Sequence, residues 1–313
     1  KVFSGEILTT FEEMNVMKDL HTVRTISNGK SAQFPVTGIA TAKYHTPGQN
    51  IADTGNSYLS QIKHAEKVIN IDDLLVASTF ISNIDELKNH YDIRSIYARE
   101  LGKALAKRFD LATMKTLVAA ARSATTITGG SAGISQQGTF AAATPTSAEL
   151  VAELFIAAQK LDENDIPNDG QRYAILKPAD YYTLLSSSEE IINRDFGGVG
   201  NVANATLPMA AGFRIYKSNH FSDIDVAEAA QDQDDDNSNN DVFGGSGTGY
   251  NGDLSQSTII GGHPSAVGTV KLLDLATESD YKIELQGTLF VANYAMGHGV
   301  LRPEASFEIK NDA

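Results

Sequence analysis

The sequence predicts an α+β fold that is elongated rather than spherical, on three observations. The chain has 313 residues, about twice the length of a typical single domain, so two structural units or one extended unit are expected. An early segment alternates apolar and polar residues as a strand does, and the segment after it has the spacing of a very long helix. Hydrophobic residues make up 42% of the chain, which is enough to form a core.

The first predicted element is a projecting hairpin. After an opening segment, residues 31–42 read as a strand, and Pro35 within it indicates an edge strand, because proline cannot donate a ladder hydrogen bond. Residues 45–61 are rich in Thr, Pro, Gly, Asn and Ser, which is typical of a turn, and a second strand is expected over residues 67–77. A two-stranded arm buries little of itself, so its apolar face needs another surface.

The second predicted element is one long helix over residues 84–121. Apolar side chains recur there at helical spacing, no proline interrupts the pattern, and Asn83 with Glu86 resembles a capping pair. At ~1.5 Å per residue this helix would be roughly 55 Å long. A helix of that length needs a partner along its whole side, which favours a wedge-shaped subunit.

A second unit with an α/β core is predicted after a Gly-, Ser- and Ala-rich connection at residues 123–146. Thr146 and Glu149 form a capping-box pattern that starts a helix, and Pro178 is expected at the first position of another. Strands are expected at residues 172–177, 213–216, 258–260, 266–273, 281–291 and 306–309.

Composition excludes several kinds of chemistry. The chain has no Cys, so disulfides, thiolate catalysis and cysteine-based zinc sites are ruled out. The net charge is −14, and the stretch between Ser218 and Val270 holds nine acidic residues without any Lys or Arg. This balance argues against sequence-specific DNA contacts, which normally use a basic surface. No apolar run of about 18 residues is present, so a membrane-spanning helix is not expected.

Three short patterns resemble catalytic or nucleotide-binding motifs, but each has the wrong context. Residues 29–31 (Gly-Lys-Ser) resemble the end of a phosphate-binding loop, yet Arg24 replaces the required glycine and a strand follows. Ser131 lies in a Gly-x-Ser-x-Gly match inside the low-complexity connection, with no helix behind it. Residues 198–203 match a dinucleotide fingerprint only loosely.

Metal sites are also poorly supported. Asp232, Asp234 and Asp236 alternate as in a calcium loop, but Asn237 and Phe243 occupy the positions that need Gly and Glu. The seven histidines do not form a metalloprotease motif. We therefore expect no catalytic residues, no cofactor-binding residues and no metal ligands.

Six segments resemble a known family, the major capsid proteins of short-tailed phages of the T7 type, which have the HK97 capsid fold. The matches are long, follow the same order and are spread over most of the chain. They are KVFSGEILTTF (1–11), RTISNGKSAQFPVTG (24–38), IKHAEKVINIDDLL (62–75), NHYDIRS (89–95), SAVGTVKLLDLA (265–276) and YAMGHGVLRPEA (294–305).

This resemblance implies a division of the chain into five parts. They are an N-terminal arm (1–30), an extended loop hairpin (31–80), a peripheral domain with the spine helix (81–145), an axial domain (146–275) and C-terminal strands returning to the peripheral domain (276–313). The axial domain would include a variable acidic loop at residues 229–256, which matches no known part of the family and is expected to be exposed and mobile.

The resemblance also implies a structural function without turnover or cofactors. The expected partners are copies of the chain, forming hexamers and pentamers of an icosahedral T=7 phage head, together with a scaffolding protein and a portal during assembly. Packaged double-stranded DNA would lie nearby without sequence-specific contacts, and no membrane would be involved. The expected location is the virion, with assembly in the cytoplasm of the host bacterium. Two alternatives are an encapsulin-type nanocompartment shell and a serine hydrolase built on Ser131.

Overall fold

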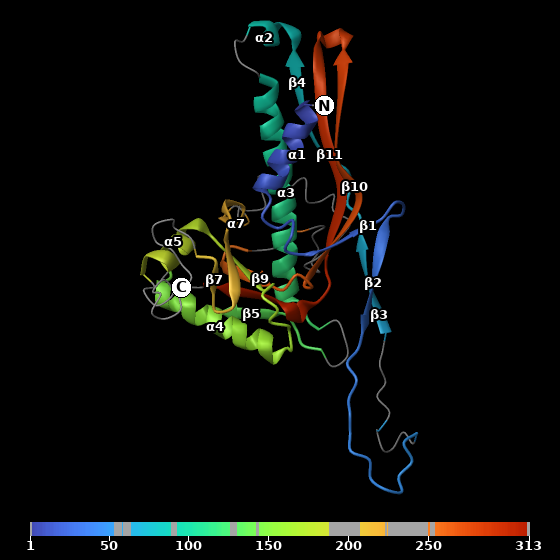
Figure 1. Cartoon of the computed structure of the whole chain (residues 1–313), viewed down its shortest axis with the longest axis vertical. Helices are drawn as coiled ribbons and strands as arrows, with labels where there is room; N and C mark the ends of the chain where they lie inside the picture. The colour runs from blue at the N-terminus through green and yellow to red at the C-terminus, as the bar shows by residue number, and fades with distance from the viewer. Residues whose placement is uncertain are drawn as a thin grey trace.

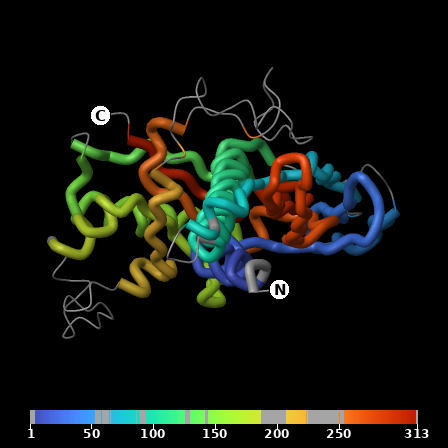
Figure 2. The backbone as a smooth tube through the Cα atoms, turned by 90° about the horizontal axis from the view of Figure 1, so that it is seen from above, coloured from blue at the N-terminus to red at the C-terminus, as the bar shows by residue number. Residues whose placement is uncertain are grey.

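The computed structural model shows an elongated molecule arranged around one long helix, α3 (Figure 1). It describes residues 2–52, 58, 64–88, 93–125, 130–141, 144–187, 207–222, 224, 250 and 254–311. A lobe of mixed helices and strands lies on one side of α3, and a hairpin extends on the other, as the view from above makes clear (Figure 2). The described secondary structure confirms the α+β fold class.

The spine is shorter than the sequence predicted, because the expected helix over residues 84–121 is two helices, α2 (Asn83–Lys88) and α3 (Ile93–Arg122). At 1.5 Å per residue, the 30 residues of α3 span about 45 Å. The Asn83 amide N–H donates to the Gln286 carbonyl oxygen at 3.1 Å, and Asn83 Nδ2 donates to the Tyr281 hydroxyl at 3.0 Å. These tertiary bonds hold α2 against a distant turn of the chain, which the local periodicity could not reveal.

A four-stranded sheet runs beside α3 and reaches the upper end of the molecule (Figure 1). Its strand order is β1-β10-β11-β4, in which β1 pairs parallel with β10 and the other pairs are antiparallel. The expected domain boundary at residues 275/276 falls inside β10. The elements are β1 (Thr22–Thr25), β4 (Leu75–Ser82), β10 (Val267–Lys282), the 3-10 turn η4 (Ile283–Leu285) and β11 (Gly287–Val300).

The lobe is built on a six-stranded sheet with the order β5-β12-β9-β6-β8-β7. The capping box at Thr146 and Glu149 is present as predicted. The last strand, β12, pairs with β5 and β9 of this sheet rather than with the four-stranded sheet beside α3, which we call the spine sheet. The elements are β5 (Ile134–Gln137), α4 (Ser147–Glu163), β6 (Tyr173–Leu176), α5 (Pro178–Ser187), β7 (Met209–Ala210), β8 (Phe213–Lys217), α7 (Asn219–Ser222), β9 (Ser257–Gly262), η5 (Pro303–Ala305) and β12 (Ser306–Lys310).

The predicted hairpin is formed by β2 (Ser31–Thr37) and β3 (His64–Asn70), paired antiparallel with Ala32 opposite Ile69. The first strand ends at Thr37, before the expected residue 42. The second expected strand, residues 67–77, is two strands in two different sheets, since β4 leaves the hairpin and joins the spine sheet. The Asp72 amide N–H donates to the Met296 carbonyl oxygen at 3.2 Å at this crossing.

The opening segment contains a helix that the sequence pattern did not predict, α1 (Val2–Met14), which packs along α3. The Asp110 side chain, buried within α3, secures the chain after α1. Its two carboxylate oxygens accept hydrogen bonds from the amides of Val16 at 3.0 Å and Met17 at 3.1 Å, and Asp110 Oδ2 also contacts His220 Nδ1 at 2.8 Å. One buried carboxylate thus connects the N-terminal segment, the spine helix and α7.

Asp110→Ala should destabilise the subunit strongly. Removing the carboxylate leaves two backbone N–H groups without their acceptor in a buried site, which costs about 2–4 kcal/mol of unfolding free energy. Urea unfolding of the chain in solution measures this change. Glu100→Ala is the matched control, because Glu100 lies on the same helix in an exposed pair with Lys103 and should change the unfolding free energy by less than about 1 kcal/mol. Equal effects of the two substitutions would contradict the anchoring role of Asp110.

Candidate assembly surfaces

The structure places the motif-like residues of the sequence in ordinary structural positions where it describes them. Gly29 has φ +119°, so residues 29–31 form a turn that leads into β2. Ser131 is exposed and is followed by the strand β5, so the strand-to-helix elbow of a serine hydrolase is not formed there. Residues 198–203, the acidic residues 232–236 and Phe243 lie outside the described residues.

The described residues also lack the features of two further kinds of site. They contain no group of three or more His, Asp or Glu side chains placed to hold a metal ion. Among the described helices, none has both the length and the apolar character needed to span a bilayer. The surfaces that stand out are instead apolar and exposed.

The first such surface is the projecting hairpin beyond β2. Ile39, Tyr44 and Ile51 are all more than half exposed, and Tyr44 is fully exposed. The Tyr58 hydroxyl accepts a hydrogen bond from the Thr46 amide at 3.0 Å and donates to Gln49 Oε1, which gives the described part of the tip a defined shape. The hairpin therefore presents large apolar side chains well away from the body of the subunit (Figure 1).

The base of the hairpin is clamped onto the spine sheet. Ala32, Ile69 and Ile71 form a small apolar cluster with Val270 and Ala295. The contact is close enough to require glycine on β11: a Cβ atom added at Gly297 would lie 1.9 Å from the Asn70 carbonyl oxygen. The backbones therefore touch directly, and this contact sets the direction in which the hairpin leaves the body.

A buried polar junction lies behind the hairpin base. The Tyr250 hydroxyl donates to Asp72 Oδ2 at 2.6 Å, just after β3, and accepts from the His298 amide at 2.9 Å. His298 Nδ1 contacts Thr269 Oγ1 at 2.8 Å. Tyr250 was expected to belong to an exposed acidic loop, but it is buried, so that end of the expected loop is anchored.

Burial holds two histidines in the neutral state, His298 of this junction and the neighbouring His21. Burial lowers the pKa of His298 to about 3, with a smaller contribution from the neighbouring His21. Burial also lowers the pKa of His21, against opposing contributions from the Met17 carbonyl, Asp110 and Asp19. The Phe109 ring contacts both imidazoles, with ring centroids 5.7 Å from His21 and 5.2 Å from His298. Two uncharged imidazoles thus pack between the N-terminal segment, α3 and β11.

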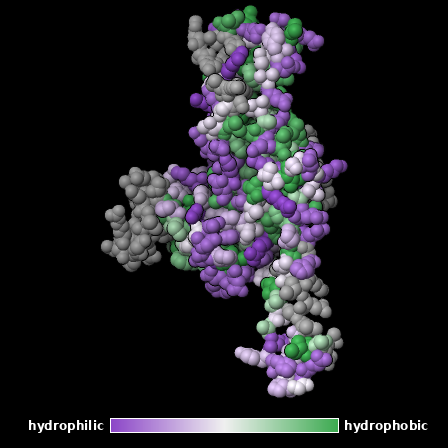
Figure 3. Space-filling model, turned by 45° about the vertical axis from the view of Figure 1, so that its right-hand side comes forward, coloured by the Kyte–Doolittle hydropathy of each residue, from purple (hydrophilic) through white to green (hydrophobic). Residues whose placement is uncertain are grey.

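The second exposed apolar surface is the upper end of the molecule, which we call the tip patch and define as Ile84, Leu87, Ile283 and Leu285. These side chains are 58%, 86%, 72% and 64% exposed, respectively. They come from α2 and η4. The hydrogen bonds of Asn83 join α2 to Gln286 and Tyr281, which flank η4. Hydrophobic residues gather at this end in the space-filling view (Figure 3). The sequence pattern did not reveal this patch because Ile84 and Leu87 fitted the buried side of an expected long helix.

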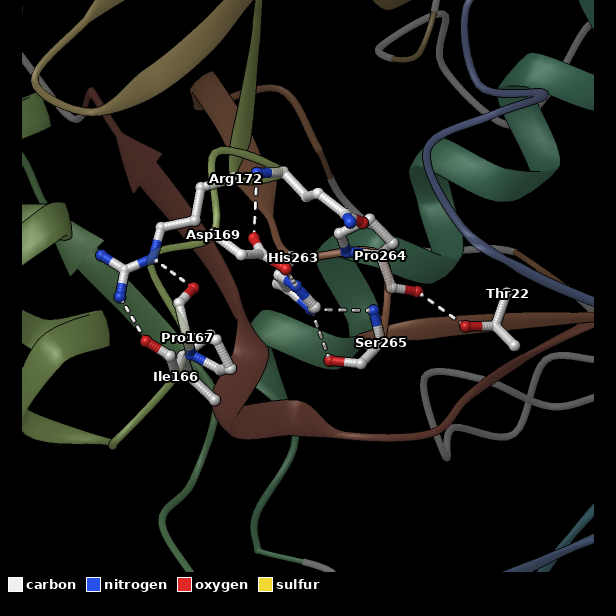
Figure 4. Close-up of polar contacts among 9 residues, drawn as sticks. Thr22, Ile166, Pro167, Asp169, Arg172, His263, Pro264 and Ser265 are labelled. Carbon is white, nitrogen blue, oxygen red and sulfur yellow. Dashed lines mark hydrogen bonds and ion pairs between the residues drawn. The ribbon is translucent and has the colours of Figure 1, made fainter.

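Polar contacts brace the lobe internally, and one of them joins it to β1 of the spine sheet (Figure 4). Arg172, buried at the start of β6, donates to the Ile166 and Pro167 carbonyl oxygens, and its guanidinium pairs with Asp162 at 2.6 Å. His263 Nε2 lies 3.5 Å from Asp169 Oδ2, and the Thr22 hydroxyl of β1 donates to the Pro264 carbonyl oxygen at 3.0 Å. The Thr22 hydrogen bond therefore links the lobe to the sheet beside α3.

A family model described as "Gp10A-like: Major capsid protein" matches residues 33–310 of the chain. The chain is 34% identical over 330 aligned residues to the major capsid protein of Escherichia phage T7, covering 98% of this chain and 89% of that protein. It is 33% identical to the major capsid protein of Enterobacteria phage T3, with the same coverage. Among solved structures, the capsid of Cyanophage P-SCSP1u is similar, with a TM-score of 0.77, 38% identity, and coverage of 95% of this chain and 88% of the other.

Gly297→Ala should disturb the hairpin base. The added Cβ cannot fit beside the Asn70 carbonyl oxygen, so β3 or β11 must shift, which costs about 1–3 kcal/mol of unfolding free energy. Gly5→Ala is the control, because a Cβ at Gly5 in α1 meets nothing within 4 Å and should leave stability unchanged or raise it by less than about 1 kcal/mol. Urea unfolding measures both variants, and a Gly297→Ala protein as stable as the control would disprove the close approach.

Subunit stability should fall in acid through His298. Its pKa is depressed in the folded state, so below pH 6.5 the unfolded chain binds a proton that the folded chain does not. The free energy of unfolding then decreases by about 1.4 kcal/mol per pH unit from this group, down to pH about 3.

Urea unfolding between pH 7.5 and 4.5 tests this dependence. His298→Gln should flatten the slope relative to the unmodified chain, because the buried imidazole is then absent. Identical slopes for the unmodified chain and His298→Gln would refute the assignment.

Proposed function

The chain belongs to the Gp10A-like family of major capsid proteins, and from this premise we propose that it assembles through the hairpin and the tip patch. Its role is that of a structural subunit of a phage capsid shell. The proposal adds the finer arrangement: hexamers and pentamers of an icosahedral T=7 head around double-stranded DNA, formed with a scaffolding protein and a portal in the host cytoplasm.

The observation that carries this proposal is the exposure of large apolar side chains at both ends of a well-packed subunit. Tyr44 on the projecting hairpin is fully exposed and Leu87 in the tip patch is 86% exposed, although the core of the subunit is closely packed. Burying apolar surface contributes about 25 cal/mol per Å², so neighbouring copies that cover both ends would gain substantial stability. Repeated contact between unlike surfaces of identical subunits produces closed assemblies when the rotation between subunits closes.

The charge of the chain supports a container that does not hold its DNA by specific contacts. A net charge of −14 gives a surface that repels phosphate groups overall. Sequence-specific readers neutralise phosphates with clustered Lys and Arg residues, which this composition does not favour. We therefore propose that the packaged DNA lies close to the shell without base-specific contacts.

We also propose a correspondence between the structure and the parts of the family fold. The N-terminal arm contains α1, the extended loop is β2 with β3, the peripheral domain is α3 with the spine sheet, and the axial domain is the lobe around β6. In this scheme β4 and η4 belong to the peripheral domain because they lie at the end that carries the tip patch.

The two alternative functions have less support. The relatives at 33–34% identity are phage capsid proteins, which favours a phage head over an encapsulin-type cargo compartment. A serine hydrolase would need Ser131 on a rigid elbow, whereas Ser131 is an exposed residue leading into a strand. The family is structural, and we propose no catalytic, cofactor or metal residue for this chain.

Co-expression with the scaffolding protein of its phage should give closed shells of uniform diameter, visible by negative-stain electron microscopy. A double variant, Leu87→Asp with Ile283→Asp, should leave the subunit folded but reduce the shell yield at least about tenfold, because two unpaired carboxylates would be buried in the contact with the neighbouring copy. Ala152→Asp, on an exposed turn of α4, is the control and should assemble normally. A chain that stays monomeric at high concentration with scaffold present would refute the proposed function.

A further inference from the structure

The turn between β1 and β2 carries the pair Asn28-Gly29. Gly29 has a φ of +119°, a conformation that residues with a side chain rarely adopt, and Asn28 beside it is exposed. Within the described chain, neither the Asn28 side chain nor the Gly29 amide makes a hydrogen bond. The side-chain amide and the backbone N–H that follows it are therefore both open to solvent.

The two ends of this turn are fixed, although its middle is not. The Ile26 amide and the Lys30 carbonyl oxygen are each held by a hydrogen bond to a distant backbone group, at 2.9 and 2.8 Å respectively. Residues 27–29 between these bonds are all exposed. A Cβ added at Gly29 would meet one backbone oxygen at 3.8 Å and no other atom within 4 Å, so there is open space around the pair.

An exposed asparagine that is followed by glycine can react with its own backbone. The Gly29 nitrogen gives up its proton and bonds to Cγ of Asn28, while the bond from Cγ to Nδ2 breaks and ammonia leaves. Water then opens the resulting five-membered succinimide at either carbonyl, which gives aspartate or iso-aspartate. The sequence consumes water, releases ammonia and needs no oxidant or reductant. Because glycine has no Cβ, no side chain shields the attacking nitrogen.

We propose that Asn28 is a site of spontaneous deamidation in the folded subunit. Each event replaces a neutral amide by a carboxylate, so the net charge of the chain falls by one unit. Iso-aspartate also routes the main chain through Cβ, which adds one carbon atom to the turn. The hydrogen bonds on either side confine this change to residues 27–29, where there is room for it. The modification therefore alters the charge of the subunit and leaves its fold in place.

The pair Asp169-Gly170 provides a contrast within the same chain. Gly170 also has a positive φ, +78°, and the Asp169 side chain is 41% exposed. Its carboxylate, however, accepts a hydrogen bond from the Gln171 amide at 3.0 Å and lies 3.5 Å from His263 Nε2 (Figure 4). The Gln171 hydrogen bond, with a smaller contribution from His263, lowers the pKa of Asp169, and an ionised carboxylate resists attack by a backbone amide. The fold therefore protects Asp169 and leaves Asn28 open.

Deamidation at this turn records the age of a subunit. In the proposed shell every copy carries the same turn, so modified copies accumulate with time and the particle becomes steadily more acidic. The inference does not depend on the capsid function, because the reaction takes place within one chain.

Peptide mapping of the folded chain tests the site. After incubation at pH 8.5 and 37 °C, trypsin cleavage at Arg24 and Lys30 releases residues 25–30, in which Asn28 is the only asparagine. This peptide should gain one mass unit, and it should resolve into aspartate and iso-aspartate forms by chromatography. The rate in the folded chain should lie within about tenfold of the rate in the free synthetic peptide, because an exposed turn needs little opening.

Two internal comparisons separate the effect of the fold from the chemistry of the residue types. Asn50 is exposed too, but the branched Ile51 follows it and the Ala52 amide donates to its Oδ1 at 3.0 Å, so it should react at least about tenfold more slowly than Asn28. Iso-aspartate at Asp169 should form at least about tenfold more slowly in the folded chain than in a synthetic peptide of residues 161–172.

Two variants complete the test. Asn28→Gln should stay unmodified over the same period, because its longer side chain would have to close a six-membered ring. Asn28→Asp, which carries the new charge from the start, should fold with an unchanged midpoint of urea unfolding. The second Asn-Gly pair of the chain, at residues 251–252, lies outside the described residues and falls in a different tryptic peptide, so it does not affect the measurement.

The inference is overturned if residues 25–30 react more than about tenfold more slowly in the folded chain than in the free peptide. Loss of folding in Asn28→Asp would also overturn it, because the new charge would then not be tolerated. Neither result bears on the capsid function, which is tested separately by shell formation of the unmodified chain.

Discussion

The need to bury the long helix α3 along its whole length governs this structure. Three parts of the chain that are far apart in sequence cover it together, since α1 lies along the helix, the spine sheet runs beside it, and the lobe packs against its C-terminal part. Two buried carboxylates fix this arrangement. Asp110, within α3, holds the N-terminal segment, and Glu308 of β12 makes a bidentate contact with Arg122 at the C-terminal end of α3. Removing one partner of such a site leaves the other buried without its partner, so a substitution on one side alone strongly destabilises the fold.

The same arrangement leaves two ends of the molecule outside the core. The middle of α3 is covered, but β4, β10 and β11 extend far beyond the core, and the hairpin projects on the other side (Figure 1). Side chains at these extremities cannot reach the central core, so the apolar ones among them stay exposed. For a lone globular protein this exposure would favour aggregation, whereas in the assembly that we propose neighbouring subunits cover these side chains.

Sequence reasoning recovered the features that local patterns encode. The capping box at Thr146, the proline that starts α5, the hairpin and most C-terminal strands follow from residue types and spacing alone. It failed where distant contacts decide the outcome. Ile84 and Leu87 continue the helical period of α3, but Asn83 is bound to Gln286 and Tyr281, which sets α2 apart. The groove of about 730 Å³ between the hairpin base and the lobe also could not be predicted, since its lining residues Glu163 and Glu304 are brought together only by the fold.

The close backbone contact at Gly297 has a consequence for shell geometry. In the icosahedral T=7 head that we propose, identical subunits occupy positions that are not strictly equivalent, so the angle between neighbours would vary from site to site. A hairpin whose base touches β11 main chain to main chain cannot tilt as a whole without lifting Asn70 off that strand. In that arrangement the angular adjustment would fall to the residues beyond Thr37, at which the described pairing of β2 with β3 ends. Curvature would then be accommodated in that outer segment, and the body of the subunit would keep one shape at every position.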